Sequence, residues 1–388
     1  MIDRDLTSRL GAAARRFPAV MLTGPRQSGK STLCRMVFPK HTYVNLEAPD
    51  VRTFAASDPR RFLAQFERGA ILDEFQRLPE LTSYLQALID EDPKRGRWIL
   101  TGSQSLTMME SVSQSLAGRT AVLHLLPLTR EESCRFKRHP KSLDEAMFTG
   151  GYPRILDQRL APGEWLGSYV RTYVDRDVRQ IAAVTDLSTF QRFVQLCASR
   201  TSQLLNLSPL ALDAGISQPT AKAWLSILEA TFIAFRLHPW VGNVGKRLVK
   251  TPKLHFYDTG LVCWLLGIRE PSQLRLHPLR GPIFETWAVT EILKHRFNRG
   301  EHAGVYFYRD RHGLEADVII EEGRTLLVVG AKAGQTATTE LVSAGRRVVD
   351  ALAGAADVKR VVVFAGDAGQ KRSDVELVSW RSMGGRRW

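Results

Sequence analysis

Residues 22–33 read "LTGPRQSGKSTL", and the eight letters from Gly24 to Ser31 match the pattern G-x-x-x-x-G-K-[S/T]. An apolar run, "AVML" (19–22), precedes this pattern, and a helical stretch, "TLCRMVF" (32–38), follows it. A loop between a strand and a helix can point its backbone N–H groups, and the helix N-terminus, at phosphate groups. The sequence therefore predicts a phosphate-binding loop between a strand and a helix.

Two side chains of this loop have expected chemical roles. Lys30 neutralises the β- and γ-phosphates of ATP, and Ser31 offers its hydroxyl to Mg²⁺. ATP and Mg²⁺ are therefore the expected ligands. The residues expected to contact the nucleotide are Gly24, Pro25, Arg26, Gln27, Ser28, Gly29, Lys30, Ser31 and Thr32.

A pair of acids ends the apolar run "AILDE" (70–74). Asp73 is expected to hold the shell of the Mg²⁺ ion, as the acid at the end of a strand does in other phosphate-loop proteins. Glu74 is then placed to polarise the attacking water. The competing interpretation is an acidic strand end that faces solvent.

Two further segments carry candidate catalytic residues. "RWILTGSQS" (97–105) ends in polar residues, where Ser103 or Gln104 could sense the γ-phosphate, or Ser103 could simply cap a helix. In "SLAGRT" (115–120), Arg119 is a candidate arginine finger for a neighbouring subunit. A surface salt bridge is the alternative for Arg119.

The rest of the N-terminal third alternates apolar runs with helical stretches. This alternation is typical of an open parallel α/β sheet. The runs that predict strands are "PAVMLTG" (18–24), "TYVNLEA" (42–48), "GAILDEF" (69–75), "RWILTGS" (97–103) and "TAVLHLL" (120–126).

The middle of the chain predicts a helical region and then a helix-turn-helix. Residues 131–195 are helical and charged, and residues 200–260 carry two helices joined at Gly215, followed by two runs suited to a wing. The start of the second helix is polar but thinly charged, so DNA reading and simple packing both remain open. Its candidate contacts are Ser217, Gln218, Thr220 and Lys222, and the better phosphate-contact candidates are Lys246, Arg247, Lys250 and Lys253.

Composition limits the class of protein. The net charge of +14 favours polyanionic partners such as nucleic acid, although dispersed solubility charge also explains it. No apolar run approaches the length of a membrane span, and the N-terminus lacks the apolar core of a secretory signal. The four cysteines are isolated, which argues against a disulfide framework and fits the cytoplasm.

Taken together, these segments resemble the prokaryotic AAA-superfamily ATPases that carry a C-terminal domain of unknown function. The resemblance covers nearly the whole chain. It implies an ATPase core at 1–130, a helical lid and winged-helix region at 131–270, and a restriction-endonuclease-like α+β domain at 271–388. The matching segments are "LTGPRQSGKSTL", "AILDEFQRLPEL", "ILTGSQS", "SLAGRTAVLHLLPLTREE", "GGYPR" and "KLHFYDTGL".

The resemblance also implies a second candidate metal site in the C-terminal domain. Nucleases of that type hold Mg²⁺ with an upstream Glu, an Asp that ends one strand, and a Glu-x-Lys on the next strand. Glu285, Asp317 and Lys332 follow that order, but Gly330 stands where the second Glu is expected. If Glu322 and Gly323 form the turn, Glu315 lies opposite Gly330 and can supply the missing carboxylate. The alternative is a decayed site in which Asp317 and Lys332 remain as a salt bridge.

The favoured function is that of a Mg²⁺-dependent ATPase that forms a homo-oligomer and acts on nucleic acid, DNA rather than RNA. No membrane association is expected. The alternatives are an ATP-gated, metal-dependent nuclease and a nucleotide-dependent switch for a protein partner.

Overall fold

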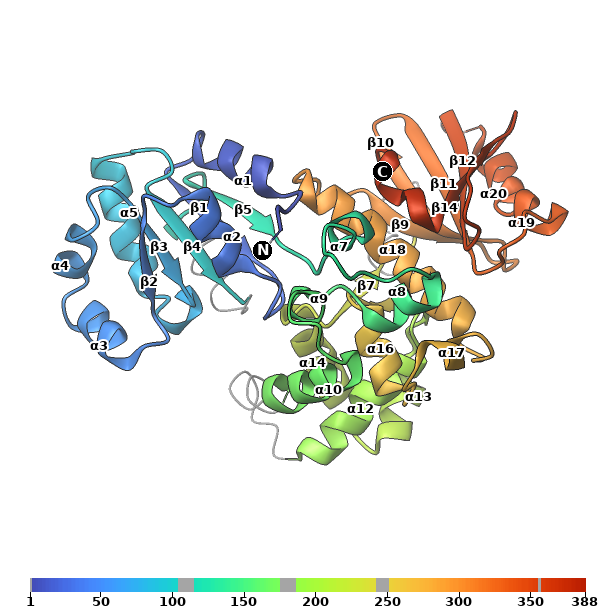
Figure 1. Ribbon diagram of the computed structural model, residues 1–388, viewed down its shortest axis with the longest axis horizontal. Helices are drawn as coiled ribbons and strands as arrows, with labels where there is room; N and C mark the ends of the chain where they lie inside the picture. Colours follow the sequence, from blue (N-terminus) through green and yellow to red (C-terminus); the bar gives the residue numbers. More distant parts are fainter. Residues whose placement is uncertain (1, 104–114, 175–185, 242–250, 355–356) are drawn as a thin grey trace. The chain divides into compact units, whose positions relative to one another are not determined.

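The strands expected in the N-terminal third form one parallel sheet in the computed structural model (Figure 1). The strand order is β2-β3-β4-β1-β5, and every neighbouring pair is parallel, so all carboxyl ends meet at one edge. This arrangement fits the expected sheet of a phosphate-loop ATPase. The strands are β1 (Ala19–Thr23), β2 (Thr42–Asn45), β3 (Ala70–Asp73), β4 (Trp98–Gly102) and β5 (Thr120–His124).

Helices cover both faces of this sheet. Successive side chains of a strand point to opposite faces, so Val20 and Leu22 pack in one apolar cluster while Met21 packs in the other. On the Val20 face lie α1 (Thr7–Ala14) and α2 (Lys30–Val37). On the Met21 face lie α3 (Pro49–Ser57), α4 (Pro59–Ala64) and α5 (Leu81–Glu91), after the short η1 (Phe75–Arg77).

The described residues are 2–103, 115–174, 186–241, 251–354 and 357–388. They divide into two compact units. The first comprises the chain up to Pro127 with residues 230–232 and 297–301, and the second comprises the remainder. The expected division at 270/271 therefore falls inside the second unit. Among these described residues, no helix is both long and apolar enough to cross a bilayer.

The second unit begins with helices and a small antiparallel sheet. Its three strands run in the order β6-β8-β7, where β6 precedes the two helices of the expected helix-turn-helix and β7 and β8 follow them. The elements are α7 (Arg130–Ser133), α8 (Leu143–Thr149), α9 (Pro153–Asp157), α10 (Pro162–Tyr169), η2 (Val170–Val174), α12 (Leu187–Ser199), β6 (Gln203–Leu204), α13 (Leu207–Ala214), α14 (Gln218–Ala230), β7 (Ala234–Leu237), β8 (Lys253–Phe256), α16 (Thr259–Leu265) and α17 (Pro271–Leu274).

The C-terminal part of this unit is a six-stranded mixed sheet preceded by a long helix. The strand order is β13-β14-β12-β11-β10-β9, with parallel pairing of β12 to both β11 and β14. The elements are α18 (Arg280–Asn298), β9 (Val305–Arg309), β10 (Glu315–Glu322), β11 (Thr325–Lys332), α19 (Thr339–Ser343), α20 (Arg346–Leu352), β12 (Asp357–Phe364), β13 (Gln370–Lys371), β14 (Glu376–Ser379) and η3 (Trp380–Gly385).

The hairpin of β10 and β11 differs from the expected register. Glu322 pairs with Thr325, so the two-residue turn is Gly323 and Arg324. Gly323 takes φ 61°, which suits the first position of a tight hairpin turn. The expected turn was one residue too early, and the predicted pairing of Glu315 with Gly330 is wrong by two residues.

A buried carboxylate joins two segments of the helical region. Asp258 is 2 % exposed, and its Oδ2 accepts a hydrogen bond of 2.7 Å from the Gly151 backbone N–H. Its Oδ1 accepts a bond of 2.9 Å from the Leu261 N–H and so caps α16. Burial raises the pKa of Asp258. The side chain therefore satisfies donors from two segments that are distant in the sequence.

We expect Asp258→Ala to destabilise the protein by roughly 1–3 kcal/mol, because two buried backbone donors lose their acceptor. Asp186→Ala is the matched control, since Asp186 caps α12 at an exposed position. The melting temperature, followed by calorimetry, should fall clearly more for Asp258→Ala. Equal shifts in the two variants would contradict the assigned role of Asp258.

Candidate functional site

The predicted phosphate loop lies between β1 and α2, at the carboxyl edge of the sheet. Gly24 has φ 145°, and a Cβ atom there would collide with the backbone carbonyl oxygen of Leu125. That close approach explains why this position requires glycine. Pro25, Arg26 and Gln27 continue the loop, and Ser31 and Thr32 lie in the first turn of α2.

Lys30 is buried and folded back on its own loop. Its Nζ donates to the carbonyl oxygens of Gly24 (3.0 Å) and Pro25 (2.8 Å). Burial lowers the pKa of Lys30 to about 8, while the charges of Glu74 and Asp73 oppose that shift. The ammonium is therefore held by two weak acceptors that the stronger negative charge of a triphosphate can replace.

The loop also has a hydroxyl that could donate a hydrogen bond to a phosphate. The Ser28 hydroxyl is buried and has no hydrogen-bond partner among the described residues. Arg4, which is 6 % exposed, donates to the carbonyl oxygens of Ser28 (2.8 Å) and Leu126 (2.9 Å). Arg4 thus fixes the outer side of the loop. Sequence reasoning missed it, because Arg4 lies outside every motif.

Asp73 is the centre of the polar contacts at this edge. It is 5 % exposed, so the interpretation of a solvent-facing strand end is wrong for Asp73. Its Oδ2 accepts from the hydroxyls of Ser31 (2.7 Å) and Tyr43 (2.6 Å), and its Oδ1 accepts from Thr101. Burial and the bond to Asp73 raise the pKa of Tyr43, which keeps Tyr43 a donor.

Ser31 and Asp73 fit the expected magnesium ion. A hydroxyl and a carboxylate are the hard oxygen ligands that Mg²⁺ prefers, and the two side chains are already in contact. A bound Mg²⁺ would neutralise charge that develops on the phosphates. Tyr43 and Thr101 were not expected; their hydroxyls orient the carboxylate and have no signal of their own in the sequence.

Glu74 is held in an unusual backbone conformation directly after β3. Its φ of 55° is left-handed, which is uncommon for a residue other than glycine, and such strained residues cluster at functional sites. The Gln76 side chain donates to Glu74 Oε2 (2.5 Å) and to Ser103 Oγ (3.0 Å). The structure therefore brings Glu74 and Ser103 together through Gln76. Gln104 lies outside the described residues, as does the segment that Ser103 would cap.

Arg119 is not near the phosphate loop of its own chain. It precedes β5, whose first residue pairs with Ala19, so it lies at the amino edge of the sheet. Its guanidinium makes two bonds to the Asp90 carboxylate, of 2.6 and 2.9 Å. Arg119 therefore forms the surface salt bridge of the alternative interpretation, and a role as a finger would have to be in a neighbouring subunit.

The carboxylates of the second candidate site gather around an unexpected lysine. Lys253, at the start of β8, has a side chain that is 3 % exposed. Its Nζ lies 2.8 Å from Glu285 Oε1 and also contacts Glu315 Oε1. The prediction that Lys253 contacts nucleic-acid phosphates is therefore wrong. Lys246, Arg247 and Lys250 lie outside the described residues.

Asp317 and Lys332 complete this cluster. Asp317 Oδ2 accepts from the Ala331 N–H (2.7 Å), and it lies 3.6 Å from Lys332 Nζ. The observed hairpin register, continued by one pair, puts Asp317 opposite Gly330. Burial, and then the charge of Asp317, raise the pKa of Glu285 to about 7, against the pull of Lys253.

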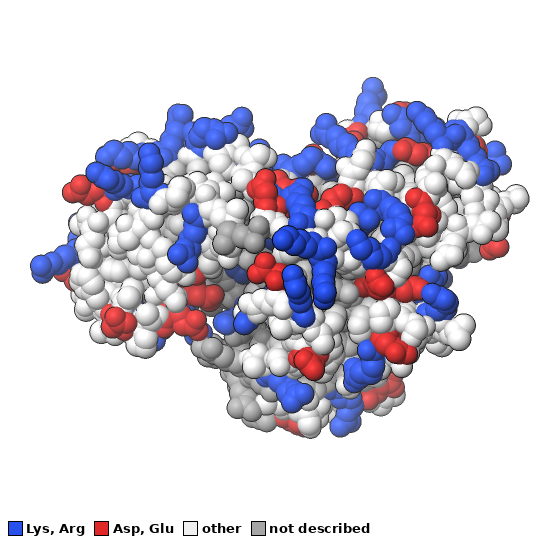
Figure 2. All heavy atoms as spheres, viewed as in Figure 1, with Lys and Arg blue, Asp and Glu red and all other residues white. Residues whose placement is uncertain are grey.

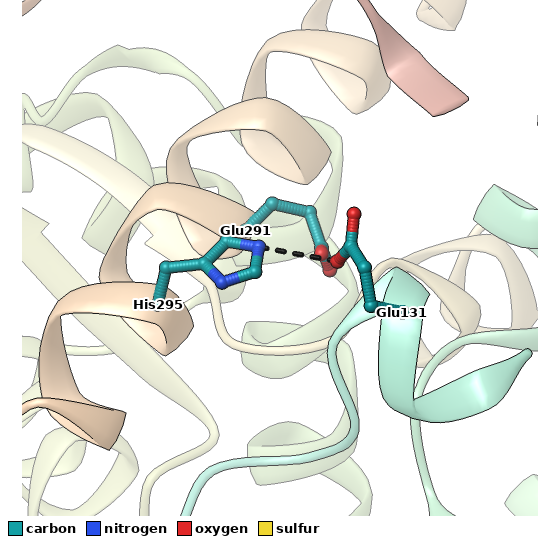
Figure 3. Close-up of side chains that lie close together, drawn as sticks. All are labelled: Glu131, Glu291 and His295. Atoms are coloured by element: carbon teal, nitrogen blue, oxygen red, sulfur yellow. Dashed lines mark ion pairs between the residues drawn. The ribbon is translucent and has the colours of Figure 1, made fainter. Parts of the chain in front are cut away.

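Another group of possible metal ligands occurs in the part of the chain that the structure describes (Figure 3). Glu131 on α7 faces Glu291 and His295 on α18, with Glu131 Oε2 at 3.2 Å from His295 Nε2. Glu291 already accepts from Lys294 Nζ and from the Arg130 N–H, each at 2.8 Å. The group therefore acts as a polar junction between α7 and α18, with Lys294 supplying positive charge.

The sequence matches three family models. They are an AAA domain at residues 16–134, a domain of unknown function (DUF8612) at 140–272 and a domain of unknown function (DUF4143) at 280–383. The N-terminal part of the chain is thus an AAA-type phosphate-loop ATPase domain.

Two curated relatives are the "Uncharacterized protein Mb2031c" of Mycobacterium bovis and the "Uncharacterized protein Rv2008c" of Mycobacterium tuberculosis. Each is 30% identical over 321 residues, which are 82% of this chain and 71% of the relative. Among solved structures, the Walker-type ATPase PABY2304 of Pyrococcus abyssi is 15% identical, with a TM-score of 0.44, over 68% of this chain and 96% of that chain. The STAND protein PH0952 from Pyrococcus horikoshii is 12% identical, with a TM-score of 0.24, over 78% of this chain and 48% of that chain.

The lowered pKa of Lys30 predicts proton uptake when ATP binds. ATP favours the charged ammonium, so binding above pH 8 must add a proton to Lys30, and affinity should fall as pH rises through about 8. Titration calorimetry in buffers of different ionisation enthalpy measures this uptake. We expect uptake just above that pH and none well below it. Equal proton uptake at the two pH values, or uptake that persists in Lys30→Arg, would contradict the assignment of this proton to Lys30.

The contact of Gln76 with Glu74 predicts a selective loss of turnover. Gln76→Glu places a second carboxylate beside Glu74, and we expect kcat to fall roughly 10- to 100-fold because the base is displaced or protonated. The KM for ATP should change little, since Gln76 does not belong to the phosphate loop. Gln76→Ala removes the contact without the repulsion and should lose less. A rise in KM at unchanged kcat would rule out this role.

Proposed function

The chain belongs to the same family as the two uncharacterized mycobacterial proteins, and from that membership and its AAA domain we propose a Mg²⁺-dependent, oligomeric ATPase that couples ATP hydrolysis to action on nucleic acid. The observation that carries the ATPase part is the constellation at the carboxyl edge of the sheet. There Lys30 and Ser31 lie close to Asp73 and Glu74, at the carboxyl ends of the strands.

Each residue of this constellation has a role in the proposed reaction. Lys30 and the loop N–H groups bind the phosphates, and Ser31 and Asp73 hold Mg²⁺. Glu74 accepts a proton from the attacking water at its carboxylate. Ser103 shares the Gln76 side chain with Glu74 as a hydrogen-bond donor, which supports a role for it in contacting the terminal phosphate. Arg119 would complete the site of a neighbouring subunit, which is the reason to propose an oligomer.

Nucleic acid is proposed as the partner from charge and from local structure. The sequence α12–β6–α13–α14–β7–β8 has the element order of a winged helix, and Ser217, Gln218 and Lys222 are exposed at the start of α14. The net charge is +14. Figure 2 shows, on the face drawn, basic side chains spread among acidic ones. The support therefore comes from α14 more than from any one basic patch.

A second candidate function is a slow nucleotide switch for a protein partner. The contact of Gln76 with Glu74 is the observation behind it: under this alternative the amide restrains the base, and Gln76→Ala raises turnover instead of lowering it. A pull-down with Glu74→Gln, which retains ATP, would recover a protein partner under this alternative.

We expect steady-state ATP turnover that requires Mg²⁺ and is lost in Lys30→Ala, because the phosphate charge is then uncompensated. Lys40→Ala is the matched control, since Lys40 is exposed just beyond α2, and it should keep full activity. Double-stranded DNA should stimulate the wild type. Lys222→Glu should reduce that stimulation, whereas Lys359→Glu, an equal charge reversal at an exposed position of β12, should not.

The outcomes separate the two halves of the proposal. Turnover that Lys30→Ala leaves unchanged would refute the ATPase. Turnover without stimulation by DNA or RNA would refute the nucleic-acid link and favour the switch.

A further inference from the structure

The carboxylate cluster of the C-terminal domain already contains a buried cation. Lys253 reaches it from β8, whereas its partners belong to α18 and β10. The Lys253 ammonium lies over the Phe307 ring, 5.5 Å from the centroid, so it is enclosed by an aromatic face as well as by acids. A buried lysine of this kind is retained only when its charge is paired.

Within the described part of the chain, the acids of the cluster and the basic groups beside them are equal in number. The acids are Glu285, Glu315 and Asp317. Lys253 pairs with the first two, Arg309 bonds Glu315 Oε2 at 3.1 Å, and Lys332 lies beside Asp317. Three basic groups thus face three carboxylates, and a divalent ion would add two charges to a balanced group.

The space around the acids is likewise used. Both Glu315 oxygens are engaged, by Lys253 and by Arg309, and Asp317 Oδ2 accepts a backbone N–H. Glu285, Glu315 and Asp317 do not form a three-ligand metal group among the described residues. The residues present therefore do not fit the Mg²⁺ ion that the nuclease resemblance implies.

The absence of a side chain at Gly330 does not by itself explain why the cluster does not fit a Mg²⁺ ion. A Cβ at Gly330 would lie 3.5 Å from Ala344 Cβ and 3.8 Å from Val362 Cγ2, which are ordinary contact distances. A longer side chain can therefore start from this position, but its carboxylate would meet a cluster whose cation is already in place.

We propose that the Lys253 ammonium is the resident cation of the Glu285–Glu315–Asp317 cluster, so that this domain binds no catalytic metal there and cleaves no nucleic acid. The lysine has the structural role that a metal ion would have, because it neutralises acids from α18 and β10 and ties both elements to β8. The proposal concerns this cluster, which joins Lys253 of β8 to acids of the C-terminal domain, and it stands whether or not the chain acts on DNA.

The test measures Mn²⁺ binding to full-length, nucleotide-free protein by electron paramagnetic resonance. Wild type and Asp317→Asn should bind Mn²⁺ equally, because no ion uses Asp317 while Lys253 is present. Lys253→Met should gain a Mn²⁺ site, and this site should be lost again in Lys253→Met/Asp317→Asn. Lys332→Met is the matched control: it removes an amine from the exposed side of the same cluster and should gain no site.

Thermal unfolding provides a second readout. Lys253→Met leaves buried carboxylates without their cation, so its melting temperature should fall and then rise on addition of Mn²⁺, whereas that of the wild type should not move. If Lys253→Met does not fold, Lys253→Gln takes its place, and the comparison of wild type with Asp317→Asn still decides.

Three outcomes would overturn the proposal. The first is Mn²⁺ binding by wild type that Asp317→Asn abolishes. The second is metal-dependent DNA cleavage that is lost in Asp317→Asn, and the third is a Lys253→Met protein that gains no Mn²⁺ site.

Discussion

One buried carboxylate, Asp73, organises the nucleotide site. It ends the second strand of the five-stranded sheet and accepts hydroxyl donors from α2, β2 and β4. A buried carboxylate needs such donors, so α2 must begin, and β2 and β4 must carry Tyr43 and Thr101, beside the end of β3. The parallel register, which aligns the strands residue by residue, makes that possible. The phosphate loop, Glu74 and Ser103 are then all positioned at one edge.

In the second unit, lysine side chains provide positive charge where acids converge. Lys253 lies among Glu285 and Glu315, and Lys294 lies against Glu291. In both places the ammonium also has a further contact, the Phe307 ring in one and the Leu128 carbonyl in the other. Removing one partner of such a pair leaves a buried charge, which typically costs about 3–5 kcal/mol. Loss of Lys253 or of one of its acids is therefore expected to destabilise the unit.

The resemblance to AAA-superfamily ATPases predicted the sites that lie within one short segment of the chain better than the site that several distant segments form. The phosphate loop and the pair Asp73–Glu74 are each one short segment, and the structure has both at the same edge of the sheet. The residues of the nuclease-like cluster come from separate segments, and the resemblance did not include Lys253 among them. Lys253 belongs to the motif "KLHFYDTGL", but its charge suggested nucleic-acid binding as long as its partners were unknown.

The sequence by itself determined the parallel sheet, the phosphate loop and the roles expected of Lys30, Ser31, Asp73 and Glu74, because these depend on hydrophobic period and on spacing within a few residues. Only the tertiary structure decided the hairpin register, since a shift of two residues leaves the same side chains on the same face and changes no pattern. It also decided the partners of Gln76, Arg4, Arg119 and Lys253. The sequence does not show whether a charged side chain is buried. Whether that side chain contacts solvent, a phosphate or a carboxylate depends on segments that are distant in the sequence and become its neighbours only in the folded protein.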